Sequence, residues 1–597
     1  MRLRLADHTY MAPIENGLHI VTPAGPVTLT GRSIARWVEA LVPQLDGRSG
    51  LDDITAGLPT AHAAMARQIL TRLLDAGVVR EVTAPPGGEP VAGPAEVAFA
   101  GAHTEGAGAA FARFRELKVA VAHEGQVGEP LAEAVADALR TSEARHVRVC
   151  AADALGDDDL WSLDVLLWIG ELGASGHDGA ARDGLAVGHV LWDGTDIWYV
   201  PVRGAKEDPL SPASLRARLR TAPRAPEPIS ALHVEAAAAQ VGRAVLRWAT
   251  GTADPRHAGK VTRIGPDLTT SRHHCAPHPY ELPATASTPE ALLTRVVHLR
   301  FRPTEDGQAF SDAAVRAADE LFGPFRFLPD DSAAQSPLHV SEAEVGDGVV
   351  RAVGFDYAET RIEAARAALT RYAAVTIDPR RLVDGGGFAL AYDLATAATV
   401  RLPAHEAFPR PAEGVGEGYG ASWDEAVARG LCTHWTRDPE LIEDARGTPV
   451  TVDPGELDAT GRRCFALLAE LGELPEVREH GGRFGVTVLS FRRGGVEVAR
   501  TAGTASAAWT RGLLEALYAV QVRVHAGRPR PPAEPRPSLP TAMWVDPGRS
   551  IDPDEVAAAL AADGRRAAVI PLDHDPFVAA IAPLSVRVAI TEEGRQA

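Results

Sequence analysis

The sequence predicts a protein of several domains in the α+β and α/β classes, and three observations carry this prediction. The chain has 597 residues, which corresponds to roughly three to five domains of ordinary size. Residues 84–110 are rich in Ala, Gly and Pro, a composition that buries too little apolar area to order itself and is typical of a linker. After this linker, strand-like and helix-like segments alternate, as they do in a sheet with crossover helices.

The first domain, residues 1–83, is predicted to begin with a small antiparallel sheet. Its three expected strands are short apolar or β-branched runs at residues 9–14, 18–22 and 26–30. The turn formers Asn16-Gly17 and Ala24-Gly25 separate these runs, and such pairs join the strands of tight hairpins. The third strand, GPVTLTG, is expected to lie at an edge of the sheet.

Three helices and a last strand complete the first domain. Helices are expected at residues 33–41 and 54–58, and a third begins at Thr60, a residue that can cap it. Apolar residues recur at helical spacing in this third helix until Gly77 ends it. Residues 78–82 have the composition of a strand. This order of elements predicts a winged helix-turn-helix.

A winged fold usually reads DNA with its recognition helix, but the residues of this domain favour peptide binding. The third helix, TAHAAMARQILTRLL, offers only Arg67 and Arg72, and the formal net charge of −19 would repel a phosphate backbone. An unpaired strand edge offers main-chain hydrogen bonds to an extended peptide, and a neighbouring helix offers pockets for its side chains. A purely structural domain is the remaining alternative.

The predicted peptide site combines the edge strand with one face of the third helix. Backbone pairing accepts many sequences, so specificity must come from the helix side chains. The residues expected to contact the peptide are Pro26, Val27, Thr28, Leu29, Thr30, Met65, Gln68, Ile69 and Arg72. Ile69 can also face the core of the domain.

Residues 111–285 are predicted to form an α/β domain with a parallel sheet. Its expected strands and helices are residues 117–122, 129–139, 146–152, 163–170 and 233–250. The turn after the first strand reads HEGQVG, so only Gly125 and Gly128 fit the pattern G-x-G-x-x-G of a dinucleotide site. Glu124 adds a carboxylate where phosphates would lie. We therefore expect a remnant of a nucleotide fold and not a working nucleotide site.

No metal or catalytic site is predicted. Residues 272–278, RHHCAPH, hold three imidazoles and a thiol, but a structural zinc site needs ligand pairs at two places in the chain. These histidines are expected at the surface, and Asp157-Asp158-Asp159 is expected in a solvated loop. The sequence contains no nucleophile elbow, Walker loop or HExxH helix.

The expected compartment is the cytoplasm. The chain has four cysteines, none in a CxxC pair, and no secretory signal at its start. No stretch approaches the ~20 apolar residues of a membrane helix. Neither a membrane nor nucleic acid is expected as a partner.

Residues 286–597 are predicted to form a larger α/β domain with a loose internal repeat. Three amphipathic helices follow glycine-containing turns at comparable spacing, in the segments RAVGFDYAETRIEAARAALTRY, GYGASWDEAVARGLCTHWTRD and RTAGTASAAWTRGLLEALYAVQ. The repeated unit would be a strand, a glycine turn and a helix. The proline-rich segment that begins at Arg528 is expected to be a surface loop.

The three domains resemble three known families in order. Residues 1–83 are similar to the precursor-peptide recognition element of enzymes that make ribosomal peptide natural products, in strand order and in the segment LVPQLDGRSGLDDITAGL. Residues 117–282 resemble the ThiF-like domain of bacteriocin cyclodehydratase partner proteins, in the stretches GLAVGHVLWDG and RHHCAPHP. Residues from about 290 onward resemble a degenerate YcaO domain, the fold that phosphorylates backbone amides with ATP to close azoline rings.

The YcaO resemblance implies a lost ATP site. In that family, glutamates on these helices hold magnesium and ATP, with a pattern like A-L-x-E-x-x-E-R-D in the second helix. In this chain Thr433 and Thr436 replace both of those glutamates, Arg371 and Ala374 stand at glutamate positions of the first helix, and Glu515 alone keeps its sign. Magnesium needs anionic oxygen ligands at close range. The resemblance therefore implies a chain without catalytic residues or cofactor of its own.

The resemblance also implies a function. Such a chain binds the leader of a ribosomally made precursor peptide and presents it to a separate YcaO cyclodehydratase, which holds the ATP and Mg²⁺ and forms thiazoline or oxazoline rings. By resemblance, thiopeptide and other azole-containing antibiotic pathways use such partners. Captured leader raises the effective concentration of the remaining peptide at the catalytic subunit. Homodimer formation stays open, as does the alternative that the chain is itself an active ATP-dependent cyclodehydratase.

Overall fold

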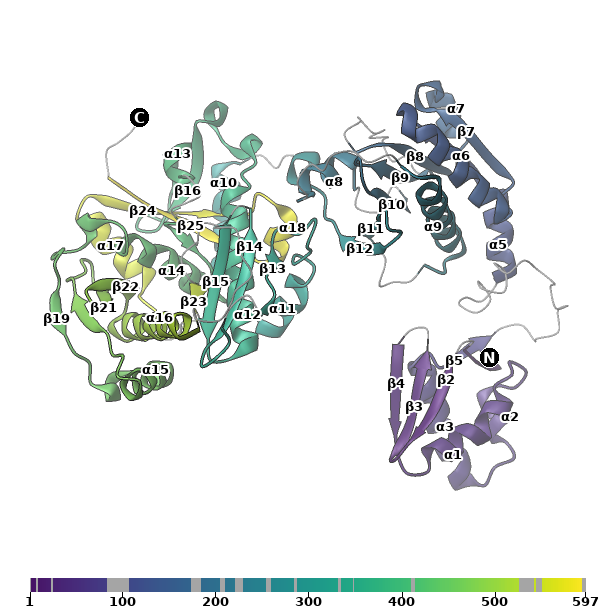
Figure 1. Cartoon of the computed structure of the whole chain (residues 1–597), viewed down its shortest axis with the longest axis horizontal. Coiled ribbons are helices and arrows are strands. Elements are labelled where there is room, and N and C mark those ends of the chain that lie inside the picture. Colours follow the sequence, from purple (N-terminus) through teal and green to yellow (C-terminus); the bar gives the residue numbers. More distant parts are fainter. Residues whose placement is uncertain are drawn as a thin grey trace. The chain divides into compact units, whose positions relative to one another are not determined.

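The computed structural model of the chain consists of two compact units of mixed α and β structure (Figure 1). Unit 1 is Met1–Asp208 with Arg224–Arg272, and unit 2 is Pro209–Pro223 with His273–Ala597. The structure describes residues 2–6, 9–22, 25–82, 107–172, 184–204, 210–220, 229–253, 259–283, 287–330, 334–346, 348–409, 414–525, 542–543 and 550–592. The predicted multidomain character with mixed helices and strands is confirmed.

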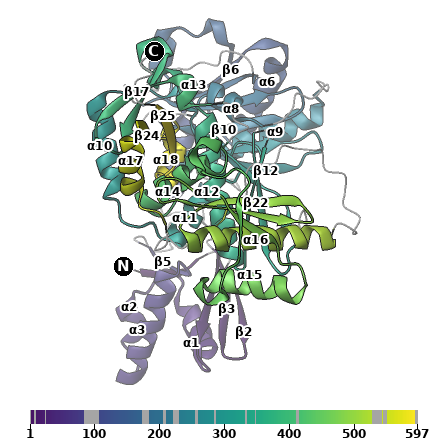
Figure 2. The same ribbon diagram turned by 90° about the vertical axis from the view of Figure 1, so that its left-hand side faces the viewer.

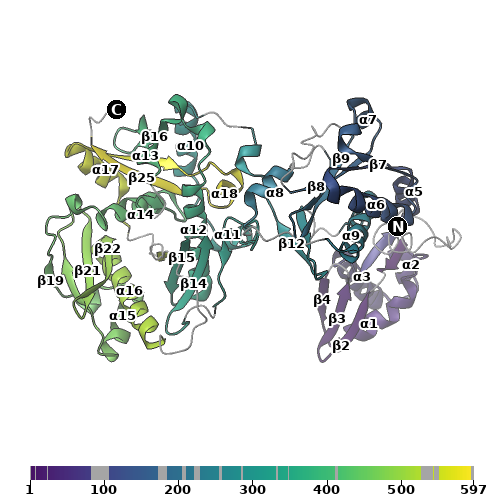
Figure 3. The same cartoon turned by 45° about the horizontal axis from the view of Figure 1, so that its top comes forward.

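Unit 1 begins with the predicted three-stranded antiparallel sheet, in the order β2-β3-β4. The strands are β2 (Tyr10–Ile14), β3 (Gly17–Thr22) and β4 (Gly25–Thr30). The elements that follow are α1 (Ile34–Leu41), α2 (Leu51–Thr55), α3 (Thr60–Asp75) and β5 (Val79–Val82). A further strand, β1 (Arg2–Leu5), was not predicted and pairs with β5. Figure 3 shows the sheet beside α1 and α3 in purple.

Apolar side chains from the sheet and from α3 form one core in this first part of unit 1. Leu18, Ile20 and Leu29 of the sheet are buried together with Ile69 and Leu70 of α3. Alternation along β3 and helical spacing along α3 bring these side chains to the same layer. The exposed face of α3 is therefore the one that carries its polar residues.

Two details of the helices differ from the sequence prediction. Thr60 does not cap α3: Pro59 precedes the helix, and no side-chain hydrogen bond caps the helix there. Helix α2 begins at Leu51, three residues earlier than predicted. An Asp53 carboxylate oxygen accepts a hydrogen bond from the backbone N–H of Gly50 at 2.9 Å, and this cap stabilises the earlier start. Gly77, with φ of +67°, ends α3 as predicted.

The rest of unit 1 is built on a seven-stranded sheet in the order β12-β11-β10-β9-β8-β6-β7. Its strands are β6 (Lys118–His123), β7 (His146–Ala151), β8 (Val165–Glu171), β9 (Ala186–Trp192), β10 (Ile197–Arg203), β11 (Lys260–Ile264) and β12 (Thr270–His274). Strands β6, β7 and β8 are parallel, as predicted. Strand β9, which was not predicted, is parallel to β8, whereas β10 pairs antiparallel with β9 and β11. The antiparallel part was missed because IWYVPVR reads as one apolar run without alternation.

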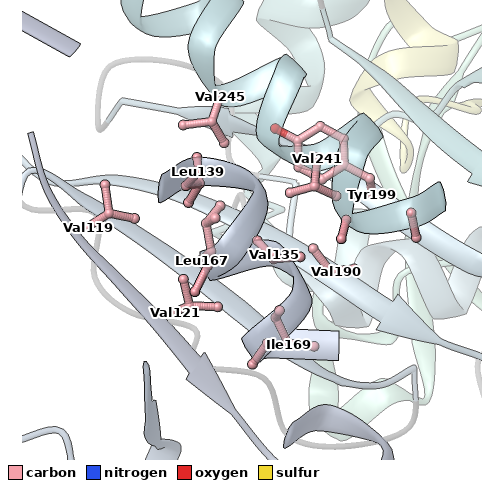
Figure 4. Packing of buried hydrophobic residues seen from close by; sticks show 14 of the residues in the cluster. Val119, Val121, Val135, Leu139, Leu167, Ile169, Val190, Tyr199, Val241 and Val245 are labelled. Carbon is pink, nitrogen blue, oxygen red and sulfur yellow. The ribbon is translucent and has the colours of Figure 1, made fainter. Parts of the chain in front are cut away.

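Helices α6 (Gly125–Thr141) and α9 (Ala231–Thr250) pack on this sheet. Figure 4 shows Val135 and Leu139 of α6 and Val241 of α9 against Leu167 and Tyr199 of the strands. Helix α5 (Ala107–Glu116) begins inside the range predicted as a linker, at residues 107–110, and continues into the predicted α/β domain, where Phe111 and Phe114 join the same core. Most of the predicted linker lies outside the described residues.

Unit 2 contains three sheets, in the orders β13-β14-β15-β23, β17-β16-β24-β25-β18 and β19-β20-β21-β22. Its strands are β13 (Arg326–Phe327), β14 (His339–Val345), β15 (Gly348–Gly354), β16 (Phe388–Asp393), β17 (Thr399–Pro403), β18 (Glu417–Gly418), β19 (Thr448–Val450), β20 (Glu476–Glu479), β21 (Thr487–Arg493), β22 (Val496–Gly503), β23 (Ala542–Met543), β24 (Arg565–Pro571) and β25 (Val586–Glu592). Its helices are α8 (Pro212–Arg218), α10 (Pro289–Arg300), α11 (Gly307–Ala314), α12 (Tyr357–Val375), α13 (Ala404–Ala407), α14 (Trp423–Trp435), α15 (Ala459–Glu470), α16 (Ala505–His525), α17 (Pro553–Ala562) and α18 (Pro576–Ile581).

The predicted internal repeat is present in unit 2. Helices α12, α14 and α16 each follow a strand, namely β15, β18 and β22. Figure 2 shows α16 above α15 in green, with α12 and α14 farther up the same unit. The proline-rich segment predicted as a surface loop lies outside the described residues.

The division into units differs from the predicted boundary at residue 285. Helix α8 belongs to unit 2, where the Arg218 guanidinium lies 2.9 Å from Asp575 and donates to the carbonyl oxygen of Pro277 at 2.6 Å. This ion pair is buried. A sequence reading places α8 with its neighbours along the chain, because the partner Asp575 is more than three hundred positions away.

Among the described helices, none is long and apolar enough to cross a membrane.

Candidate functional site

The free edge of β4 presents unpaired backbone groups in an alternating pattern. Gly31 donates its N–H to the carbonyl oxygen of Asn16 at 2.8 Å, directly beyond the pairing of β3 with β4. In an antiparallel pair, hydrogen-bonded positions alternate with positions that point away. Val27 and Leu29 therefore bond to β3, whereas Thr28 and Thr30 direct their N–H and C=O groups to the free edge. No described strand pairs with that edge.

Six of the nine predicted peptide-contacting residues have exposed side chains. They are Pro26, Thr28, Thr30, Met65, Gln68 and Arg72. Val27 is half-buried, but Leu29 and Ile69 are buried in the core, with 8% and 3% of their surfaces exposed. The prediction that Leu29 and Ile69 contact a peptide does not agree with this burial. Both belong to the apolar core of this part of unit 1.

The two arginines of α3 differ in their surroundings. The Arg67 guanidinium donates to a carboxylate oxygen of Asp52 at 2.6 Å, and both side chains are exposed. Arg72 forms no ion pair with a described residue and lies on the exposed surface. Met65, with 45% of its surface exposed, lies two helical turns before it. The exposed face of α3 thus offers an apolar side chain and a cation to a ligand.

The residues at the turn between β6 and α6 disfavour the binding of a phosphate group. Gly125, with φ of +73°, starts α6, and a helix N-terminus ordinarily attracts anions. Glu124 immediately precedes the helix, and a Cβ placed on Gly125 would lie 4.0 Å from a carboxylate oxygen of Glu171. Two carboxylates at this end of α6 repel phosphate groups. The geometry therefore agrees with the expected remnant of a nucleotide fold.

The residues around Cys275 pack inside unit 2 and do not lie at the surface as predicted. The His273 ring lies 3.2 Å from Asp319, and the ring of His274 stacks on Phe577 at 5.5 Å between centroids. Only 9% of His273 and 4% of Cys275 are exposed. No group of three or more potential metal-ligating side chains occurs in the part of the chain that the structure describes.

The acidic run at residues 157–159 forms the first turn of helix α7 (Asp157–Trp161), so the prediction of a loop was wrong. Asp159 accepts a hydrogen bond from the backbone N–H of Gly156 at 3.1 Å and pairs with Arg148 at 3.0 Å. An acidic residue in the first turn is favourable because it complements the helix dipole. The run is therefore explained by the helix it begins.

A buried network of alternating charges joins α12 and α14 in unit 2. The Arg429 guanidinium lies 2.9 Å from Glu363 and 3.0 Å from Glu425, and it stands 4.1 Å above the ring of Tyr419. Glu363 also contacts Arg366, which pairs with Glu305 at 3.2 Å. Burial raises the pKa of Glu305, and the attraction of Arg366 opposes that rise.

These pairings do not fit a magnesium site. The carboxylates on α12 and α14 already surround a guanidinium, and Arg371, at a position where a carboxylate was expected by resemblance, pairs with Glu417 at 2.6 Å. The Thr433 hydroxyl accepts from the N–H of Gly416 and donates to the carbonyl oxygen of Gly430 at 2.6 and 2.7 Å. A hydroxyl committed in this way offers no anionic oxygen to a metal.

Arg429, the central member of this network, is not predicted from the sequence. Arg429 stands four positions after Glu425, and such a pair is a recognised helical signal. Its second partner, Glu363, lies on another helix. Nothing in one sequence shows that the two helices meet.

A cavity of about 560 Å³ adjoins the network. Residues of α12, α14, α16 and β22 line it, and they include Arg371, Thr433, Thr436 and Glu515. The structure thus brings together four of the positions that the YcaO resemblance singled out. Ala374 does not line the cavity.

Comparison with known proteins identifies the fold. No protein-family model and no curated protein matches the sequence. A solved structure described as a heterocyclase in complex with substrate and cofactor is similar, with a TM-score of 0.60 and 14% identity over 100% of this chain and 95% of that chain. The heterocyclase TruD has a TM-score of 0.57 and 14% identity, with the same coverage.

A third structure, YcaO from Methanopyrus kandleri bound with AMPPCP and Mg²⁺, has a TM-score of 0.32 and 17% identity over 52% of this chain and 91% of that chain. That similarity is too low to support an argument. The first two similarities extend along the whole sequence. This chain therefore has the fold of these heterocyclases.

Proposed function

We propose that this chain binds the leader of a ribosomally made precursor peptide and presents it to a separate ATP-dependent YcaO cyclodehydratase. The observation that carries the proposal is the free edge of β4, where Thr28 and Thr30 direct their peptide groups outward. An extended leader adds to this edge as a strand. Met65, Gln68 and Arg72, all exposed on α3, supply contacts that distinguish one leader from another.

The buried network in unit 2 supports a role without catalysis. Glu363 and Glu425 surround Arg429, so they are not available to a divalent cation. The fold shared with heterocyclases supports an origin in the same chemistry. The catalytic subunit then forms the thiazoline or oxazoline rings, in a pathway to a thiopeptide or another azole-containing peptide. A short precursor gene rich in Cys and Ser beside an intact YcaO gene is the expected genomic setting.

Leader binding is tested with the purified full-length chain. A fluorescently labelled leader from the neighbouring precursor gene is titrated with the protein, and fluorescence polarisation reports the bound fraction. We expect saturable binding that unlabelled leader reverses and duplex DNA does not. Displacement by DNA at physiological salt would support the alternative of a DNA-binding domain. Absence of binding would refute the proposal.

The second candidate function is that the chain is itself an ATP-dependent cyclodehydratase. Its fold match to heterocyclases over the whole length favours this alternative. Incubation of the chain alone with precursor and Mg-ATP distinguishes this enzymatic function from leader binding, because each ring formed removes one water from the peptide. Mass spectrometry that finds this loss without any partner would establish the enzyme and exclude the non-catalytic role.

A further inference from the structure

The cavity in unit 2 is lined by more cations than anions. Its charged residues are Arg351, Arg371, Arg429, Arg437, Arg500, Arg511, Glu417, Glu497 and Glu515. Six arginines thus face three glutamates. A cavity of about 560 Å³ is large enough for a small organic anion, since ligand pockets commonly measure about 300–1,000 Å³.

Four of the six arginines have carboxylate partners. The pairs are Arg351 with Glu342, Arg371 with Glu417, Arg429 with Glu363 and Glu425, and Arg500 with Glu497. Arg437 and Arg511 form no ion pair with a described residue. Arg437 and Arg511 are therefore the cations of the cavity that have no carboxylate partner among the described residues, and Glu515 is the remaining carboxylate of its lining.

Arg511 is in an unfavourable environment as the structure stands. Its Nε is buried without a hydrogen-bond partner, and one terminal nitrogen donates to the carbonyl oxygen of Ala502 at a long 3.4 Å. Burial lowers the pKa of Arg511, and the nearby charge of Arg429 lowers it further. A buried cation without a carboxylate destabilises a folded protein. Packing alone does not account for an arginine here, whereas a ligand of opposite charge does.

We propose that this cavity binds a small phosphate-bearing anion without a metal ion, and that Arg437 and Arg511 are its main ligands. A guanidinium matches the oxygens of phosphate through paired hydrogen bonds. Two unpaired cations balance the double charge of a phosphate better than the single charge of a carboxylate. No cluster of carboxylates suited to Mg²⁺ accompanies them among the described residues. This site is separate from the proposed leader site on β4 and α3.

The site is tested by isothermal titration calorimetry of the full-length chain with sodium pyrophosphate, and separately with ATP, in EDTA and then in excess Mg²⁺. We expect saturable pyrophosphate binding in EDTA that weakens when Mg²⁺ neutralises the anion. Tighter binding of ATP than of pyrophosphate would identify a nucleotide as the source of the phosphate, and equal binding would identify the phosphate group alone. No saturable binding in EDTA, or binding that requires Mg²⁺, would overturn the proposal.

Three variants assign the binding to the cavity. Arg511→Met and Arg437→Met are each expected to weaken pyrophosphate binding by about tenfold or more. Arg523→Met is the matched control, because Arg523 lies on the same helix, α16, but pairs with Glu473 and does not line the cavity. Unchanged affinity in both cavity variants, or an equal loss in the control, would refute the assignment.

Two further readouts separate a ligand role from a structural one. Without pyrophosphate, Arg511→Met should melt at the same temperature as the natural chain or higher, since it removes a partly buried cation that has no carboxylate partner. Because Arg437 is exposed, Arg437→Met tests the site even if the first variant fails to fold. Leader binding by fluorescence polarisation should stay unchanged in both variants, so failure of this proposal leaves the proposed function untouched.

Discussion

At the level of single residues, the proposed leader site depends on the direction of each peptide group in β4. Thr28 and Thr30 point outward, whereas Val27 bonds to β3. A proline at an outward position removes a donor from the free edge and leaves the hairpin hydrogen bonds intact. A proline at Val27 removes a bond within the sheet and tests stability instead of leader binding.

We expect Thr28→Pro to weaken leader binding by about tenfold or more, because one strand-addition hydrogen bond and its neighbours are lost. Thr28→Val is the control, since it removes the hydroxyl and keeps the N–H. Fluorescence polarisation measures the affinity, and circular dichroism checks the fold. Equal loss in both variants would show that the hydroxyl, and not the peptide group, contacts the leader.

Substitutions of exposed and of buried residues of α3 should have different effects in the same assays. Arg72→Glu reverses an exposed charge and should weaken leader binding without a change in melting temperature. Ile69→Ala empties a buried position and should lower the free energy of unfolding by about 2–5 kcal/mol. A destabilised Arg72→Glu would contradict the exposure on which the site is built.

The sequence predicted the two elements of the proposed site, the edge strand and the third helix, whereas leader binding to them stays a prediction. The edge strand and the third helix are where the hairpin turns and helical spacing placed them. Leu29 and Ile69 are buried in the core, as was allowed for Ile69 but not for Leu29. Only the packing of sheet against helix decides which face is inside.

At the level of elements, buried ion pairs join α12 and α14. Arg429→Met leaves Glu363 and Glu425 buried without a partner. We expect the free energy of unfolding to fall by about 3–5 kcal/mol. Adding Glu363→Gln and Glu425→Gln should recover part of this loss, because neutral side chains need no counter-charge. Chemical denaturation measures each variant, and a single variant as stable as the natural chain would contradict the account.

The contact of α14 with β25 should make the protein sensitive to acid. Burial lowers the pKa of His434 to about 4 from its ordinary 6.5, and its Nε2–H donates to the carbonyl oxygen of Val588 at 3.0 Å. The unfolded chain takes up this proton at higher pH than the folded chain does. Stability is therefore fully present above about pH 6.5 and decreases as the pH falls toward 4.

We expect His434→Gln to reduce this sensitivity, because glutamine donates a similar hydrogen bond and does not titrate. The melting temperature is compared at about pH 7 and about pH 5 in both proteins. The difference between the two temperatures should be smaller in the variant. An identical difference would show that other groups carry the acid response.

Helical spacing and glycine turns predicted α12, α14 and α16, because each helix has a local signal in the sequence. The charge network between the helices has no such signal. Glu363 and Arg429 are 66 positions apart. Their contact depends on where strands β15 and β18 position helices α12 and α14. Tertiary contacts of this kind cannot be predicted from local patterns in a single sequence.

At the level of the whole molecule, we propose that unit 2 is where the catalytic YcaO subunit docks. The proposal rests on the sequence resemblance of residues from about 290 onward to a YcaO domain, since related folds commonly pair through related surfaces. A fragment ending at residue 285 is a poor test, since it keeps Arg218 and loses its buried partner Asp575. Hydrogen exchange of the full chain is better suited. Adding the partner should slow exchange in segments of residues 287–592, and protection confined to residues 2–204 would contradict docking on unit 2.

The prediction of a multidomain chain followed from composition, but the division between its units did not. Linker composition and the alternation of strands and helices are local properties. The assignment of α8 to unit 2 depends on Arg218 reaching Asp575. The boundary between the units therefore depends on contacts between distant residues and not on the composition of any one segment.

The central claim is that this chain supplies leader binding and not chemistry. The most direct measurement is the initial rate of water loss from the precursor, followed by mass spectrometry, with Mg-ATP and the catalytic YcaO partner present. We predict no rings with the chain alone, slow formation with the partner alone, and faster formation with both, an increase that Thr28→Pro largely removes. Ring formation by the chain alone, or equal rates with and without it, would contradict the account.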